Sequence, residues 1–199
     1  MKKLAVFVSG GGSDLQSLID AVDRGYISNA RIDAVVSSNE NAFALIRAEK
    51  HGIHGVVYNK KQFGGDETLM FEALKEYLAE MQIDYIILAG YLRIIPPFFV
   101  RAFENRIINI HPALIPKFCG DGFYGMKVHE AVIAAGVKES GATVHFVDEG
   151  TDTGKIILQE KVPVIDGDTA ETLQKRVLEL EHRLLPKAVK LLTERKIKI

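Results

Sequence analysis

Hydrophobic residues in the first half of the chain follow two alternating patterns. Short continuous apolar runs, typical of buried strands, cover residues 3–8, 31–36, 55–58, 85–89 and 107–110. Between the runs, apolar residues recur at the i, i+3, i+4, i+7 spacing of a helix, as they do from Leu15 to Val22. Helices are also predicted over residues 42–51 and 66–81. Strands that alternate with helices predict a mostly parallel sheet covered on both faces.

The second half of the chain has a different pattern. Residues 112–124 contain Pro, Gly and Cys without periodicity, and we expect a long functional loop there. A helix is predicted over residues 128–135, and strands over 141–147 and 155–164. The short connection between these two strands indicates an antiparallel pair or an irregular loop.

The last segment carries a helix-start signal. Asp168, with Glu171 three residues later, resembles a capping box, and a long helix is predicted to continue towards Lys196. These elements together predict an α/β fold with a Rossmann-like open sheet. The sheet is expected to be parallel in the N-terminal half and mixed towards the C-terminus, with helices on both faces. No repeat or linker interrupts the pattern, so residues 1–199 are expected to form a single domain.

Composition and charge narrow the class of protein. The chain is 47% hydrophobic and 26% charged, the balance of an ordinary globular protein. A formal net charge of −1 provides no general attraction to nucleic acid or to membranes. Cys119 is the only cysteine, so neither an intrachain disulfide nor a cysteine-based zinc site can form, which fits a reducing compartment.

No targeting segment is predicted. The apolar run over residues 4–8 is too short for a signal peptide, and three glycines follow it where a cleavage site does not fit. The longest apolar stretch, residues 85–100, is interrupted by Arg93 and two prolines and is not expected to span a bilayer. We therefore expect a cytoplasmic protein.

A glycine-rich loop, SGGGS at residues 9–13, joins the first predicted strand to the first helix. Glycines let a backbone approach a ligand closely, and a helix N-terminus favours an anion, so the loop predicts a phosphate site. The alternative is a simple tight turn. No Gly-Lys-Ser/Thr follows, which excludes a Walker A motif, and Leu15 stands at the third glycine position of a dinucleotide fingerprint. A single phosphate therefore fits better than a nicotinamide cofactor.

A second candidate is the segment Asn109-Ile110-His111-Pro112. Residues i and i+2 of a strand face the same way, so Asn109 and His111 are expected to lie on one side at a strand's carboxyl end. Ligands of open α/β sheets bind at such ends. Asn109 offers an amide donor and His111 a donor or proton carrier. The alternative is a pair of hydrogen-bonded structural residues.

Two loops complete the candidates. Residues 90–96 form an apolar loop that follows a strand and could form the wall of a site for a flat heterocycle, or simply pack against the next helix. Residues 148–154 contain three acids, of which the pattern alone selects none.

His51 and His54 have a spacing seen in metal sites, but no other ligand pattern accompanies them, and no metal is predicted. His145, in an apolar strand, is expected to be a satisfied core histidine.

Several segments in order resemble the phosphoribosylglycinamide formyltransferases, the folate-dependent glycinamide ribonucleotide transformylases of purine biosynthesis. The resemblance covers essentially the whole chain. Its segments are residues 8–13 with Leu15-Gln16, 88–94, 109–116, 141–147, Asp152-x-Gly154 with 157–159, and Glu181-His182. It implies the formyltransferase fold, with residues 1–100 as an approximate nucleotide- and phosphate-binding half and 101–199 as an approximate catalytic and folate half.

The resemblance also implies the activity and the roles of individual residues. A formyl group would move from 10-formyltetrahydrofolate, the co-substrate, to the amine of glycinamide ribonucleotide. Asn109 and His111 would stabilise the oxyanion, and Asp152 would raise the pKa of His111 and help relay the proton. The remaining implied residues are Leu92, Arg93, Ile94, Ile95 and Asn109 for the folate, Gly11, Gly12, Ser13 and Asp14 for the phosphate, and Glu181 for the ribose hydroxyls.

Asp14 departs from the pattern, since many relatives carry Asn at this position. A carboxylate beside a phosphate is unfavourable unless it points away to cap the helix, so we expect the backbone N–H of Asp14, rather than its side chain, to contact the phosphate. The resemblance assigns no role to the longer loop at residues 120–125 or to Cys119, and no feature predicts a particular oligomeric state.

Other functions remain open at this stage. Methionyl-tRNA formyltransferase and formyltetrahydrofolate hydrolase share the Asn-x-His-Pro segment, but each has an additional domain for which this chain is expected to have no room. A non-catalytic nucleotide-binding or sensor module on the same type of sheet is the alternative from another class. It would keep the glycine loop and leave Asn109, His111 and Asp152 without a function.

Overall fold

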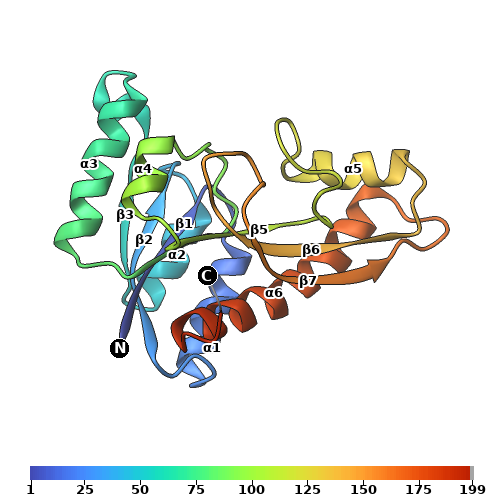
Figure 1. Cartoon of the computed structure of the whole chain (residues 1–199), viewed down its shortest axis with the longest axis horizontal. Helices are drawn as coiled ribbons and strands as arrows, with labels where there is room; N and C mark the ends of the chain where they lie inside the picture. The colour runs from blue at the N-terminus through green and yellow to red at the C-terminus, as the bar shows by residue number, and fades with distance from the viewer. Residues whose placement is uncertain (198–199) are drawn as a thin grey trace.

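The computed structural model describes residues 1–197, which form a seven-stranded sheet and its covering helices (Figure 1). The strands are β1 (Lys2–Val8), β2 (Ala30–Ser37), β3 (His54–Val57), β4 (Tyr85–Leu88), β5 (Ile107–His111), β6 (Glu139–Phe146) and β7 (Ile156–Pro163). The helices are α1 (Ser13–Asp23), α2 (Phe43–Lys50), the 3-10 helix η1 (Lys60–Phe63), α3 (Glu67–Glu80), α4 (Pro97–Ala102), α5 (Met126–Ala134) and α6 (Ala170–Thr193).

The strand order is β3-β2-β1-β4-β5-β6-β7. The five strands from β3 to β5 pair in parallel, whereas β5 with β6 and β6 with β7 pair antiparallel. The predicted fold class is confirmed, because the sheet is parallel in its first half and mixed beyond it. The predicted strands over residues 141–147 and 155–164 form the antiparallel pair β6 and β7.

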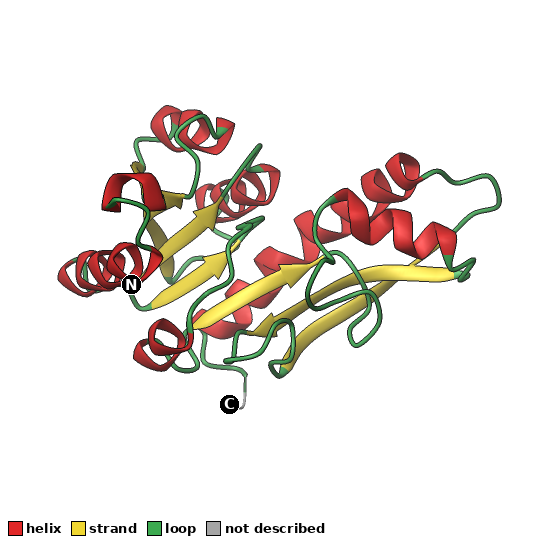
Figure 2. Cartoon of the chain, turned by 90° about the horizontal axis from the view of Figure 1, so that it is seen from above, coloured by secondary structure: helices red, strands yellow, loops and turns green. Residues whose placement is uncertain are grey.

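Two apolar layers pack on the two faces of the sheet. Along β1, Leu4, Val6 and Val8 face the layer that contains α1, α2 and α6, whereas Ala5 and Phe7 face the layer that contains α3 and α4. Figure 2 shows these helices on both sides of the strands. A central strand buried on both faces needs a continuous apolar run, which explains why periodicity of two is absent from β1. Within residues 1–197, no helix is both long enough and apolar enough to cross a membrane.

The start of α6 differs from the sequence expectation by one residue. The N-cap is Thr169, whose hydroxyl accepts a hydrogen bond from the backbone N–H of Thr172 (3.3 Å), while the Thr172 hydroxyl accepts one from the N–H of Thr169 (2.9 Å). Asp168 instead accepts a hydrogen bond from the N–H of Ile165 and pairs with Arg176, whose Nη1 lies 2.6 Å from Oδ2. The predicted capping box is therefore wrong in its members, and the helix begins one residue later than expected.

The sheet topology determines where a ligand can enter. From β1 the chain continues to β2 and β3 on one side, and then returns to β4 on the other side of β1. Connections therefore leave β1 and β4 in opposite directions, which opens a crevice at their carboxyl ends. The glycine-rich loop follows β1 at this position, and the loop of residues 90–96 follows β4.

Candidate functional site

A cavity of about 610 Å³ lies at the carboxyl ends of β1, β4 and β5. This volume is within the range of sites that bind small molecules. All the residues predicted from the sequence to bind or to react line it: Gly11, Gly12, Ser13, Asp14, Leu92, Arg93, Ile94, Ile95, Asn109, His111, Asp152 and Glu181. The structure therefore brings together five segments that are far apart in the chain.

Backbone groups form the glycine-rich end of the cavity. Gly12 has a positive φ of 69°, and a Cβ atom there would lie 2.6 Å from the Cβ of Ala44, so only glycine fits without strain. The carbonyl of Gly10 accepts a hydrogen bond from the N–H of Ala44 (3.1 Å), and that of Gly11 accepts one from Nε of Arg47 (2.9 Å). With these carbonyls held towards α2, the N–H groups of the first turn of α1 are left for a ligand, because that turn offers them no acceptor.

A single hydroxyl connects this loop with the apolar loop after β4. The Ser9 hydroxyl lies 2.6 Å from the Ser38 hydroxyl and accepts a hydrogen bond from the N–H of Leu92 (2.9 Å). The ends of β1, β2 and β4 are thereby held at fixed separations. This arrangement gives the mouth of the cavity a defined width.

The apolar loop presents two of its side chains to solvent. Leu92 and Ile94 are 63% and 69% exposed, whereas Tyr91 and Ile95 are buried and anchor the loop to the core. Arg93 also lines the cavity, and its Nη1 lies 3.4 Å from a carboxylate oxygen of Glu67. An exposed apolar pair at the edge of a cavity is suited to cover the face of a flat ring.

Asn109, His111 and Asp152 meet on the opposite wall. Asn109 Nδ2 donates to Asp152 Oδ1 (3.4 Å), and His111 Nδ1 lies 3.6 Å from Asp152 Oδ2. The other ring nitrogen of His111, Nε2, lies 2.8 Å from the carbonyl oxygen of Phe118. Because a carbonyl only accepts, Nε2 carries a hydrogen, and Nδ1 is the atom that gains or loses the proton.

The backbone after His111 folds around a buried hydroxyl. Thr143 on β6 donates to the carbonyl of Ala113 (2.6 Å) and accepts from the N–H of Ile115 (3.2 Å). These bonds direct residues 112–118 back across the sheet, which places the carbonyl of Phe118 against His111. The long loop expected from the sequence is therefore ordered at its start by β6.

Burial and the nearby carboxylate shift the pKa of His111 in opposite directions. The ring is only 4% exposed, and burial lowers its pKa, while Asp152 and the Phe118 carbonyl act to raise it. The net pKa lies below the usual value, so the free protein holds a neutral ring beside a carboxylate. The predicted influence of Asp152 has the expected sign, but burial outweighs it.

Asp152 itself stays ionised. Burial would raise its pKa, but hydrogen bonds and charge from His145, His111 and the N–H of Gly120 lower it below the usual value. The Gly120 N–H donates to Oδ2 at 3.0 Å. Among the three acids of residues 148–154, Asp152 is the one that reaches the histidines, while Asp148 accepts hydrogen bonds within its own loop. The choice of Asp152 agrees with this geometry.

The cavity is also lined by two histidines that were not predicted from the sequence as site residues. His145 lies opposite Asn109 in the β5–β6 register, with Nε2 at 3.2 Å from Asn109 Nδ2 and 3.5 Å from Asp152 Oδ1. The expectation of a core histidine is right about its burial but misses this position in the site. His129 on α5 is buried, burial and His111 lower its pKa to about 4, and its Nδ1 has no hydrogen-bond partner among the described residues.

Only the antiparallel register between β5 and β6 reveals the position of His145. Thr143 and His145 alternate along β6 as Asn109 and His111 do along β5, and the two pairs face each other. No comparable pattern in the sequence marks His129. The missed residues thus come from tertiary pairing rather than from local motifs.

Asp14 and Glu181 occupy the end of the cavity beside the glycine loop. The Asp14 side chain does not cap α1, because Gly12 is the N-cap and no side chain caps it. Asp14 lies in the first helical turn, buried, and Oδ1 has no hydrogen-bond partner within residues 1–197. Burial raises its pKa to about 7, and burial together with the nearby Asp14 raises that of Glu181.

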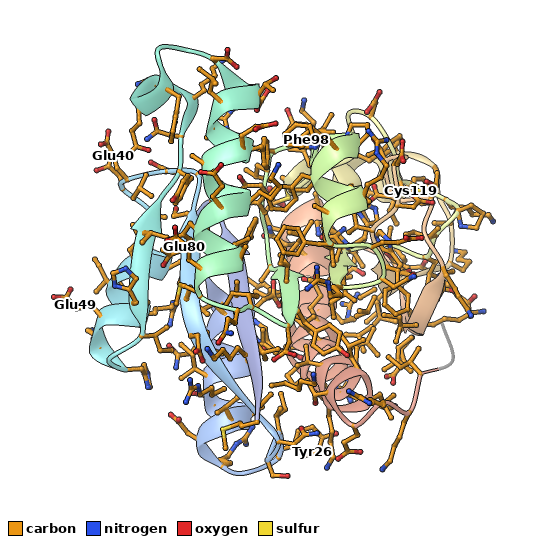
Figure 3. The ribbon with its side chains drawn as sticks, turned by 60° about the vertical axis from the view of Figure 1, so that its left-hand side comes forward. Tyr26, Glu40, Glu49, Glu80, Phe98 and Cys119 are labelled. Atoms are coloured by element: carbon orange, nitrogen blue, oxygen red, sulfur yellow. The ribbon has the colours of Figure 1, made fainter. Side chains whose placement is uncertain are left out.

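The remaining candidates lie outside the cavity. Within the described part of the chain, no group of three His, Cys, Asp or Glu side chains is placed to hold a metal ion. His51 Nδ1 is instead 3.4 Å from a carboxylate oxygen of Asp23. Cys119 lies in the loop beside the site, far from Glu40 and Glu49 on the other side of the view in Figure 3. Its thiol donates to the carbonyl of Pro116 at 3.4 Å.

Comparison with known proteins agrees with this geometry. The profile of the formyl transferase family matches residues 2–189. A phosphoribosylglycinamide formyltransferase from Haemophilus influenzae is 39% identical over 100% of this chain and 91% of its own length. A chloroplastic protein of the same name from Vigna unguiculata is 44% identical over 98% of this chain, which spans only 62% of that relative.

Solved structures resemble the whole chain. A glycinamide ribonucleotide transformylase 1 from Symbiobacterium toebii superimposes with a TM-score of 0.93 at 38% identity, covering 100% of this chain and 91% of its own. A phosphoribosylglycinamide formyltransferase from Brucella melitensis gives a TM-score of 0.88 at 41% identity, with 96% and 95% covered.

Proposed function

The chain belongs to the formyl transferase family, and from this premise we propose that it transfers a formyl group from 10-formyltetrahydrofolate to the amine of glycinamide ribonucleotide in purine biosynthesis. One observation carries the proposal. The cavity joins an anion-binding loop, an apolar wall and the group of Asn109, His111 and Asp152. A phosphorylated amine and a flat formyl donor can meet there beside donors for an oxyanion.

The ribonucleotide is proposed to bind at the glycine-rich end. Its phosphate accepts hydrogen bonds from the backbone of residues 11–14, where the helix N-terminus favours an anion. Glu181, across the cavity on α6, faces the ribose hydroxyls. The glycinamide amine then extends towards Asn109. The proposed division at about residue 100 is approximate, because Glu181 and residues 92–95 bind across it.

The folate is proposed to bind against residues 92–95 and Asn109. The fit rests on the exposed side chains of Leu92 and Ile94, which lie at the cavity edge and become covered when a flat ring packs on them. When bound, 10-formyltetrahydrofolate supplies the activated formyl group. Arg93 borders this wall, and its guanidinium pairs with Glu67 at 3.4 Å.

Asn109 and His111 are proposed to stabilise the transition state. The amine nitrogen forms a bond to the formyl carbon, and negative charge develops on the formyl oxygen. Asn109 donates an Nδ2 hydrogen to it, giving up the long 3.4 Å bond to Asp152. His111, held at Nε2 by Phe118, presents Nδ1 as the site of the second proton.

Asp152 is proposed to stabilise the protonated ring of His111 and to help carry the proton. As the intermediate collapses, the bond from the formyl carbon to the folate nitrogen breaks. The amine loses a proton overall and the folate nitrogen gains one. An ionised carboxylate 3.6 Å from Nδ1 favours the charged ring at the stage when the oxyanion needs a donor.

A turnover assay tests the proposal. Purified protein is incubated with 10-formyltetrahydrofolate and glycinamide ribonucleotide, and formation of the formylated product is followed by mass spectrometry. The matched control is the glycinamide ribonucleoside, which lacks only the phosphate. We expect fast turnover of the ribonucleotide alone. Binding without turnover would instead support a sensor module, and transfer to neither compound would favour another formyl-folate enzyme.

The cellular location stays a prediction. The sequence favours the cytoplasm, while the plant relatives are named as chloroplastic proteins. The proposed substrates are small molecules and do not distinguish the cytoplasm from the chloroplast. Fractionation of the source cells followed by activity measurement would test the prediction.

A further inference from the structure

The structure points to a proton that enters with the ribonucleotide. We propose that Asp14 binds the phosphate as a neutral acid: the carboxyl takes up a proton when the ribonucleotide binds, and its O–H donates to a phosphate oxygen. This inference rests on the proposed function, because it concerns the same ligand at the same end of the cavity.

The first observation is an unsatisfied carboxyl in a binding cavity. Asp14 Oδ1 is fully buried without a hydrogen-bond partner among residues 1–197, and the Asp14 side chain lines the cavity beside Gly12 and Ser13. A buried carboxylate is normally hydrogen-bonded, because leaving it unpaired costs free energy. A ligand or a proton is therefore required to satisfy it.

The second observation is a like-charged neighbour. Glu181, on the facing side of α6, is almost completely buried, borders the same cavity and makes no hydrogen bond with any described residue. Each carboxyl makes ionisation of the other less favourable, and burial acts in the same direction. Burial raises the pKa of Asp14 to about 7, so Asp14 titrates near neutral pH.

The positive groups around Asp14 do not compensate. Arg47 from α2 donates to the Gly11 carbonyl and to Gln16, so its donors are already directed to neutral acceptors. His182 Nε2 lies 4.0 Å from Asp14 Oδ1, beyond hydrogen-bond distance, and burial and Arg47 lower its pKa against the opposing effects of Asp20 and Glu179. The N-terminus of α1 contributes about half a positive charge, which favours an ionised Asp14. Burial outweighs this effect, because the pKa of Asp14 is still raised to about 7.

A phosphate arriving beside an ionised Asp14 would add a third acidic group to this end of the cavity. Protonation removes the repulsion and converts Asp14 from an acceptor into a donor, which a phosphate oxygen can use. The sign of the pH dependence follows. Below about pH 7 the free carboxyl already holds its proton, and above about pH 7 binding must take one from solvent.

Calorimetry measures this proton directly. Binding of glycinamide ribonucleotide, without folate, is titrated at about pH 8 in two buffers of different ionisation enthalpy, and the difference between the heats gives the number of protons taken up. We expect uptake approaching one proton in the wild type beyond that in Asp14→Asn. In the wild type, affinity should fall about tenfold more per pH unit above neutrality than in the variant.

Asp14→Asn is the matched variant, because the amide keeps the shape and the donor while it removes the titration. Protons that belong to the phosphate or to the amine of the ligand enter both measurements equally and cancel. A second control changes the ligand instead of the protein, so it does not depend on the folding of a variant. The glycinamide ribonucleoside, which lacks the phosphate, should bind to the wild type with less proton uptake than the ribonucleotide.

Three outcomes would overturn the inference. Equal proton uptake in the wild type and Asp14→Asn excludes Asp14 as the acceptor. Uptake that is kept in Asp14→Asn but lost in His182→Asn assigns the proton to the imidazole. Equal proton uptake with the ribonucleoside and the ribonucleotide shows that the uptake does not depend on the phosphate. If turnover is present in these cases, the proposed function stands, whereas wild-type protein that neither binds nor formylates the ribonucleotide overturns both.

Discussion

The two ends of the cavity are formed by different groups, the backbone at one end and side chains at the other. At the glycine-rich end, the cavity is lined by the backbone of residues 10–14 at the start of α1, where three consecutive glycines precede the helix. At the other end, side chains from β5, from β6 and from the loop of residues 148–154 meet around Asp152. The first end depends on local backbone conformation, and the second depends on strand register. Substitutions should therefore affect them in different ways.

The largest effect is expected at the side-chain end. Asn109→Ala and His111→Ala each remove a donor to the developing oxyanion, which typically slows the reaction about a hundred- to a thousandfold. Neither residue belongs to the glycine-rich end, so the ribonucleotide Kd should change little. Steady-state kinetics with both substrates give kcat, and equilibrium titration gives Kd. Turnover within a few-fold of the wild type in both variants would remove these residues from the catalytic group.

A smaller loss of rate, about a hundredfold, is expected for Asp152→Asn. Removing the carboxylate disfavours the imidazolium, so the His111 pKa should fall further. NMR titration of His111 measures the shift. Glu149→Gln is the matched control, because Glu149 is exposed and pairs with Arg101 rather than with a histidine. An unchanged His111 titration in Asp152→Asn, or an equal shift in the control, would contradict the assignment.

At the backbone end, Gly12→Val should weaken ribonucleotide binding at least about tenfold and spare the folate. A branched side chain at this φ strains the backbone by about 1–3 kcal/mol, and its Cβ meets Ala44. Gly11→Val separates fold from binding, because a Cβ there meets nothing within 4 Å. It should leave the melting temperature unchanged and still weaken the ribonucleotide. Equal loss of both ligands in the Gly11 variant would make the loop purely structural.

The smallest effect is expected on the apolar wall. Leu92→Ala removes a side chain that is exposed in the free protein, so stability should stay within about 0.5 kcal/mol of the wild type. The side chain becomes covered only when the folate binds, and KM for 10-formyltetrahydrofolate should rise about fivefold. A changed KM for the ribonucleotide instead would place this wall at the wrong end of the cavity.

The sequence predicts the backbone end more fully than the side-chain end. Continuous apolar runs in β1 and β4 and the glycines after β1 are local signals, so the sheet and the glycine-rich loop can be located without any knowledge of tertiary structure. Asn109 and His111 are also local, because two residues in one strand share a face. Asp152 needed the family resemblance, since nothing local separates it from Asp148.

The other residues of the site cannot be predicted from local sequence, because their positions depend on tertiary pairing. His145 joins the site only through the antiparallel register of β5 and β6, and His129 only through the placement of α5. Asp14 shows a limit of local reasoning: Asp is a good N-cap residue, but the N-cap of α1 is Gly12 in a left-handed conformation, and Asp14 lies in the first turn and lines the cavity. Local propensity is overridden where the backbone is shaped for a ligand.

The position of Glu181 on α6 has a consequence for folding. The phosphate loop forms from the first residues of the chain, but the wall that faces it comes from the final helix, which packs on α1, β6 and β7. A chain that has not yet docked α6 holds only half of the phosphate end, so native affinity appears only when the two extremes of the sequence have met. Ligand at a hundred times its Kd would then stabilise the completed fold by about 2.7 kcal/mol, and the ribonucleotide would act as a reporter of cooperative folding.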